Sequence, residues 1–173
     1  MDTIEVEISD TQGHLRTDPS EVIDLARRVL LGEGRRNASI SIALVDQASI
    51  HALNRVHLRH DWPTDVISFT LSNPDDPALS GELVVSAEMA VATAAEDGVR
   101  PRDELALYIV HGLLHLCGYD DSTESDAAEM RRREDEILTE FGYSNPFRSL
   151  PGGEAPSEPA LFRPITEPPE ACP

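Results

Sequence analysis

Lysine is absent from this sequence of 173 residues, cysteine occurs only twice, and aromatic residues make up 5% of the chain. All 14 basic side chains are therefore arginines, and 32 acidic side chains outnumber them, so the formal net charge is −18. An acidic surface repels anionic partners, which argues against general electrostatic binding to nucleic acids or membranes. If the protein binds phosphate, it must do so through a few well-placed arginines.

The scarcity of cysteine and the lack of long apolar runs indicate the cellular compartment in which the protein works. Cys117 and Cys172 are too few for a disulfide framework, which favours a reducing environment. No apolar run approaches the ~20 residues that a membrane span needs. The first eight residues have neither the basic start nor the apolar run of a signal peptide. We therefore expect a cytoplasmic protein with no membrane partner.

Composition divides the chain near residue 144. A hydrophobic share of 40% is sufficient for a core, and the length suits a single domain. Eight of the 13 prolines fall between residues 146 and 173, a segment with little apolar content. Such composition is typical of disordered segments. We expect one compact domain over residues 1–144 and a proline-rich, disordered tail over residues 145–173.

Hydrophobic periodicity predicts a mixture of strands and helices. Alternation and short apolar runs predict strands, and helical spacing with capping residues predicts helices. The expected strands are 3–8, 39–45, 66–69 and 82–85, and the expected helices are 19–31, 48–56, 87–97, 101–116 and 124–141. The absence of regular βαβ alternation favours an α+β fold, with a small mixed sheet of about four strands packed with helices. Residues 105–116 are apolar on nearly every side, which predicts a central buried helix.

Two histidines on this helix form a candidate metal site. His111 and His115 are four residues apart, so their side chains lie on one helix face, one turn apart. Gly118 can end the helix in a left-handed turn, and that turn could return Asp121 as a third ligand. Two imidazoles and one carboxylate suit Zn²⁺ and leave a fourth position for water. The alternative interpretation is a pair of core histidines that hydrogen-bond to the backbone.

The residue after the first histidine separates this site from zinc peptidases. Peptidases with comparable spacing place a glutamate there as general base, whereas this chain has Gly112. The site therefore looks hydrolytic, but a peptide substrate is disfavoured.

Several segments resemble one known family. Residues 111–120, HGLLHLCGYD, resemble the signature of the YbeY family of bacterial endoribonucleases. Residues 53–54 (LN) with 63–69 (PTDVISF), and residues 81–86 (GELVVS), are similar to further motifs of that family in the same order. The resemblance covers about residues 40–144. It implies a metal-dependent enzyme that cleaves single-stranded RNA in ribosomal RNA processing and ribosome quality control.

The chain departs from the family pattern at two positions. Asp121 stands where the family has a third metal-binding histidine, and its negative charge makes bound water less acidic and shifts the preference toward harder divalent ions. Leu58 stands where the family has a functional arginine. Arg55 or Arg59 can supply that charge from a neighbouring position, although at a different angle.

Residues 47–60 form an acid-free stretch in this acidic chain. The stretch contains Arg55 and Arg59 and could face a phosphate backbone. The alternative is a solvated helix and loop without function.

Two carboxylates remain to be assigned. Asp65 either orients a ligand histidine and positions water, or satisfies backbone donors in its turn, and Glu134 either binds the free N–H of a ligand histidine or extends toward solvent.

The sequence thus predicts a metallo-endoribonuclease with one Zn²⁺, or another divalent ion, on His111, His115 and Asp121. Arg55, Arg59 and Asp65 are the candidate catalytic residues, and the expected partners are ribosomal RNA and the ribosome or its small subunit. One alternative is a ribosome-assembly factor whose metal is structural and whose catalysis is weak or lost. Another is a metal-dependent hydrolase of a different substrate.

Overall fold

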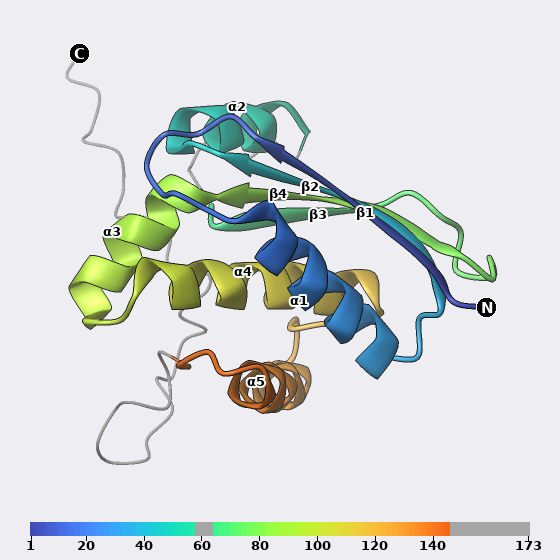
Figure 1. Ribbon diagram of the computed structural model, residues 1–173. Helices are drawn as coiled ribbons and strands as arrows, with labels where there is room; N and C mark the ends of the chain where they lie inside the picture. Colours follow the sequence, from blue (N-terminus) through green and yellow to red (C-terminus); the bar gives the residue numbers. More distant parts are fainter. Residues whose placement is uncertain (58–63, 146–173) are drawn as a thin grey trace.

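A four-stranded mixed sheet forms the centre of the molecule (Figure 1). The computed structural model describes residues 1–57 and 64–145. The strands are β1 (Thr3–Asp10), β2 (Asn37–Val45), β3 (Val66–Thr70) and β4 (Leu79–Ser86), in the order β1-β2-β4-β3. The first three in this order are parallel, and β3 is antiparallel to β4. The predicted α+β fold with a small mixed sheet is confirmed. Of the predicted tail, residues 145–173, only Asn145 is described, and residues 146–173 lie outside the described residues.

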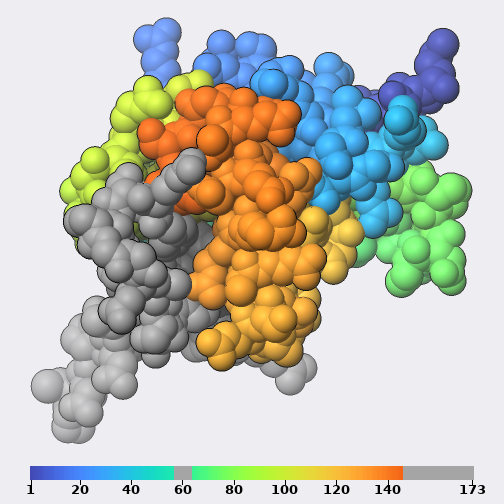
Figure 2. Space-filling model, turned by 90° about the horizontal axis from the view of Figure 1, so that it is seen from below, coloured from blue at the N-terminus to red at the C-terminus, as the bar shows by residue number. Residues whose placement is uncertain are grey.

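Five helices surround this sheet within the described part of the chain. They are α1 (Pro19–Gly32), α2 (Gln47–His57), α3 (Ala87–Asp97), α4 (Pro101–Leu116) and α5 (Glu124–Glu140). Helices α1 and α4 lie against one face of the sheet, and α2 lies on the other (Figure 1). Helix α5 packs on the side of α4 that faces away from the sheet, and it spreads across the lower surface of the molecule (Figure 2). Helix α4 is therefore enclosed between the sheet and α5.

Local sequence signals explain where these helices begin and end. Asp18 caps α1 by accepting a hydrogen bond from the Ser20 amide, and Ser86 caps α3 through the Met89 amide. Thr123 caps α5 in the same way, accepting from the Asp126 amide. Such caps satisfy backbone N–H groups that have no partner inside the helix. The capping residues thus mark where α1, α3 and α5 begin.

Gly112 determines how closely α4 approaches the sheet. A β-carbon built at this position would lie 2.8 Å from Leu83 Cδ2 and 3.0 Å from Val66 Cγ2. The Ser68 hydroxyl, on β3, donates a hydrogen bond of 3.2 Å to the Gly112 carbonyl. The absence of a side chain at residue 112 therefore lets the backbone of α4 lie against side chains of β3 and β4. The glycine that replaces the peptidase glutamate has a packing role here.

Candidate metal centre

Helix α4 and the loop after it bring His111, His115 and Asp121 together. The Nε2 atoms of the two histidines are 3.1 Å apart. Asp121 Oδ2 lies 3.7 Å from His111 Nε2 and 3.6 Å from His115 Nε2. Gly118 has a φ of 107°, so the chain turns back directly after the helix. Bonds of 2.0–2.2 Å to a tetrahedral Zn²⁺ place ligand atoms about 3.3–3.6 Å apart. One observed separation, 3.6 Å, lies in this range, and those of 3.1 and 3.7 Å lie within 0.2 Å of it.

The other ring nitrogen of each histidine has an acceptor. His111 Nδ1 lies 2.6 Å from Glu134 Oε1, on α5, and His115 Nδ1 lies 3.1 Å from the carbonyl oxygen of Tyr119. We assign the ring protons to these Nδ1 atoms, because a carbonyl and a carboxylate accept hydrogen bonds. Both Nε2 lone pairs then point into the same space. Of the two roles that the sequence left open for Glu134, the structure shows the hydrogen bond to His111.

This donor arrangement fits a cation. Two Nε2 lone pairs at 3.1 Å repel each other unless a proton or a metal ion lies between them, and Asp121 adds a negative charge beside them. Burial and the charge of His111 lower the pKa of His115, which keeps that imidazole neutral and free to bind. Burial alone also lowers the pKa of His111, but Glu134, Asp65 and Asp121 raise it overall. The same negative groups favour a divalent cation.

Asp65 lies just before β3 and is buried. Its Oδ1 accepts a hydrogen bond of 2.8 Å from the Val66 amide and one of 3.2 Å from the Thr64 hydroxyl. Burial raises the pKa of Asp65 to about 6, against the opposing effect of His111. The carboxylate thus satisfies donors in its turn and also interacts electrostatically with a candidate ligand.

Of the two predicted arginines, only Arg55 lies within the described residues, and it is not part of this cluster. Arg55 is exposed on α2, which covers the opposite face of the sheet from α4 (Figure 1). Arg59 and Leu58 lie outside the described residues. The relation of the acid-free stretch to the metal ligands therefore stays a prediction.

Sequence reasoning missed Glu104 and Tyr108, two buried polar residues on α4. They precede His111 by seven and three residues, so all three lie on one face of the helix. Their spacing from His111 could have predicted that they share its helix face. We overlooked it because a glutamate in the first turn of a helix is already explained by the helix dipole, and a tyrosine in an apolar helix by the core.

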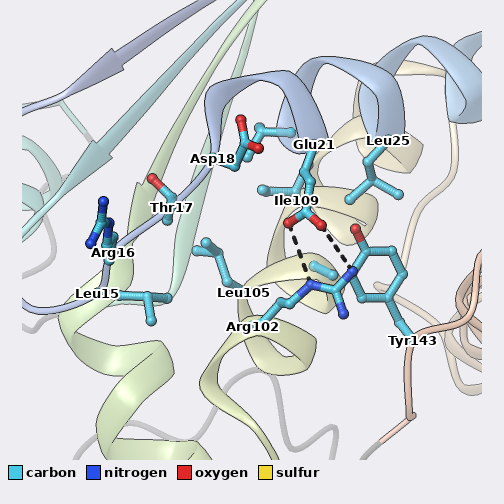
Figure 3. A pocket seen from close by; sticks show the side chains of 12 residues that line it. Leu15, Arg16, Thr17, Asp18, Glu21, Leu25, Arg102, Leu105, Ile109 and Tyr143 are labelled. Carbon is cyan, nitrogen blue, oxygen red and sulfur yellow. Dashed lines mark hydrogen bonds and ion pairs between the residues drawn. The ribbon is translucent and has the colours of Figure 1, made fainter.

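A separate pocket of about 70 Å³ lies between α1 and α4 (Figure 3). Its walls are mostly apolar and include Leu105 and Ile109. At its mouth the Arg102 guanidinium pairs with Glu21 at 3.2 Å and lies 4.7 Å from the Tyr143 ring centre. The lining includes none of the three candidate metal ligands, so the chemistry is assigned to the histidine pair instead.

Comparisons with known proteins agree on one family. A family model described as Endoribonuclease YbeY matches residues 7–142. Endoribonuclease YbeY of Rhodopirellula baltica is 40% identical over 144 residues, which cover 82% of this chain and 74% of that protein. The protein of the same name from Carboxydothermus hydrogenoformans is 38% identical over 138 residues, 79% of this chain and 96% of that one.

A solved structure shares the fold. The solution structure of TM1509 from Thermotoga maritima superposes with a TM-score of 0.55 at 23% identity, and the match covers 88% of this chain and all of that one. Within residues 1–57 and 64–145, no helix has the length and apolar character that a membrane span requires. The family model and the curated relatives identify this chain as a member of the YbeY family.

Proposed function

We propose that this protein is a metal-dependent endoribonuclease that cleaves single-stranded RNA, with ribosomal RNA as the substrate and the ribosome or its small subunit as the partner. The observation that supports the metal is the convergence of two Nε2 atoms and one carboxylate oxygen, each within 3.7 Å of the others. The names of the relatives support RNA as the substrate. We further propose that the protein acts in the cytoplasm, in ribosomal RNA maturation and quality control.

In this proposal His111, His115 and Asp121 hold one Zn²⁺ or a similar divalent ion. Such an ion polarises a phosphate oxygen and lowers the pKa of water. Glu134 and the Tyr119 carbonyl fix both imidazole rings, so that each presents Nε2 to the ion. Asp65 adds negative charge near His111, and Arg55 and Arg59 hold phosphate oxygens of the RNA.

Removal and return of the metal test this function. Purified protein should cleave a single-stranded RNA oligonucleotide, lose the activity after chelation, and regain it with stoichiometric Zn²⁺ or Mn²⁺. A duplex of the same sequence should be cleaved at least about tenfold more slowly, since base pairing restricts the backbone geometry needed for attack. Cleavage that survives complete removal of metal, confirmed by elemental analysis, would contradict the proposal.

The acid-free stretch at residues 47–60 supplies a prediction about RNA affinity. The double variant Arg55→Ala, Arg59→Ala should bind single-stranded RNA more weakly. If each arginine contacts one phosphate, the slope of log K against log salt should fall by about 1.4, because each contact on a single strand contributes about 0.7. Arg27→Ala with Arg36→Ala removes the same charge from exposed sites and serves as the control. If the two double variants show the same salt slope, the RNA binds at a surface other than residues 47–60.

Leu58 favours a second candidate function. If the family's arginine charge is missing rather than supplied by Arg55 or Arg59, the protein acts as a ribosome-binding factor with a structural metal. Binding of the small ribosomal subunit without cleavage of any single-stranded RNA would support this alternative.

A further inference from the structure

The segment that follows α1 contacts the loop after α4. This loop, residues 117–121, ends at the third candidate ligand and is called the ligand loop. The Arg35 guanidinium donates a hydrogen bond of 2.9 Å to the carbonyl oxygen of Cys117. The Tyr119 hydroxyl donates one of 3.0 Å to Glu33 Oε2. The end of α1 therefore lies close to the end of α4, and two residues between α1 and β2 hold the ligand loop (Figure 1).

Glu33 also binds helix α5. Its Oε1 accepts a hydrogen bond of 2.5 Å from Arg133 Nε, while its Oε2 accepts the one from Tyr119. The Glu33 side chain is 10% exposed and that of Arg133 is 23% exposed, so solvent screens this charged contact less than it screens a surface pair. Both carboxylate oxygens have a donor, and the two donors come from different elements. One side chain thereby connects the end of α1, the ligand loop and α5.

Each of the two donors is next to a group that orients a candidate ligand. The Tyr119 carbonyl oxygen lies 3.1 Å from His115 Nδ1. Fixing the hydroxyl of this tyrosine limits the movement of the whole residue, including the carbonyl that holds the imidazole. Arg133 directly precedes Glu134, whose carboxylate lies 2.6 Å from His111 Nδ1. The carboxylate that binds both donors therefore influences the surroundings of both histidines.

We propose that Glu33 is a positioning residue for the metal site, which holds the ligand loop against α1 and α5 through Tyr119 and Arg133. The loop supplies two groups to the site, the Asp121 carboxylate and the carbonyl that orients His115. A loop that is ordered before the ion arrives loses less entropy when the ion binds, so the affinity for the ion is higher. This role rests on the proposed metal site and gives Glu33 no bond to the ion.

The first test measures the order of the ligand loop without metal, by amide hydrogen exchange. The residue-119 amide donates to the Leu114 carbonyl and should exchange about tenfold faster in Glu33→Ala and in Tyr119→Phe. Amides in the middle of α4 should keep their wild-type rates. Glu136→Ala is the matched control, because it removes an exposed acceptor of Arg133 and should leave the loop unchanged. Unchanged exchange at residue 119 in Glu33→Ala, or an equal acceleration throughout α4, would overturn the proposal.

The second test measures Zn²⁺ affinity by competition with a chelator. Glu33→Ala and Tyr119→Phe should each bind about tenfold more weakly than wild type. The double variant should bind no more weakly than Glu33→Ala, because both changes remove the same contact. Glu33→Gln keeps an acceptor oxygen and should recover part of the affinity, and Glu136→Ala should match wild type.

The affinities separate this role from the metal site itself. Wild-type affinity in Glu33→Ala, or a double variant whose loss is the product of the two single losses, would refute the positioning role alone. Absence of Zn²⁺ binding by wild type would refute the metal site and this role with it, whatever the exchange rates show.

Discussion

Replacing His115 by alanine should abolish stoichiometric metal binding and reduce cleavage of single-stranded RNA by at least about a hundredfold. His115 supplies one of the three proposed ligand atoms, and His111 with Asp121 alone is expected to hold an ion only weakly. The side chain is 27% exposed, so its loss leaves little unfilled space and the fold should persist. Metal content by elemental analysis and cleavage of a labelled oligonucleotide measure the two effects in the same preparation.

His14→Ala is the matched control, because it removes an exposed histidine from the segment before α1. It should retain metal and activity. Cleavage at the wild-type rate by His115→Ala would reveal a contaminating nuclease or a site elsewhere in the chain. Asp121→Ala should also lose metal, whereas Asp121→His, which restores the family's ligand, should retain it. Full metal retention in Asp121→Ala would make Asp120 or water the third ligand.

Introducing the peptidase glutamate at residue 112 should unfold the protein instead of creating a peptidase. The first side-chain atom alone would lie 2.8 Å from Leu83 Cδ2, in a part of the core where Leu83 is fully buried. A carboxylate at this point would have no room and little solvation, so we expect Gly112→Glu to cost at least about 4 kcal/mol. Gly112→Ala should cost about 1–2 kcal/mol, because overpacking exceeds the gain in helix propensity. Urea denaturation followed by circular dichroism measures both.

Gly32, at the exposed end of α1, offers the comparison. Its added β-carbon would meet only the end of the flexible Arg133 side chain, at 3.4 Å. The same two substitutions there should change stability by less than about 1 kcal/mol. A stable Gly112→Glu variant that hydrolyses peptides would contradict this prediction and would support the peptide-hydrolase interpretation that the sequence disfavoured.

Local spacing was sufficient to predict much of this molecule. The intervals from His111 to His115, Gly118 and Asp121 lie within about three helical turns, so helix geometry and one glycine turn determine their convergence. Strand ends were less accurate. The last strand was expected to begin near residue 82, but β4 begins at Leu79, where its pairing with Ala38 of β2 extends the ladder. Such pairing joins residues far apart in sequence, so local hydrophobic alternation cannot predict where a strand begins.

Tertiary contacts decided the remaining features. The sequence allowed two roles for Glu134, and only the packing of α5 on α4 places its carboxylate 2.6 Å from His111 Nδ1. Asp65 and His111 are far apart in the chain, and they interact electrostatically because α4 packs against β3. The close approach at Gly112 likewise depends on which sheet residues face the helix. These contacts depend on how the helices pack on the sheet, and the hydrophobic periodicity of a single segment does not predict such packing.

The hydrogen bond between Glu134 and His111 has a consequence for biosynthesis. A ribosome makes the chain from its N-terminus, so both histidines and Asp121 emerge before the residue that orients His111. A nascent chain that ends before α5 contains all three candidate ligand side chains, but its His111 ring lacks the Glu134 carboxylate that orients it. Metal capture in the native geometry therefore awaits the docking of the last described helix. The proposed metal-dependent cleavage is therefore expected only after α5 has left the ribosome.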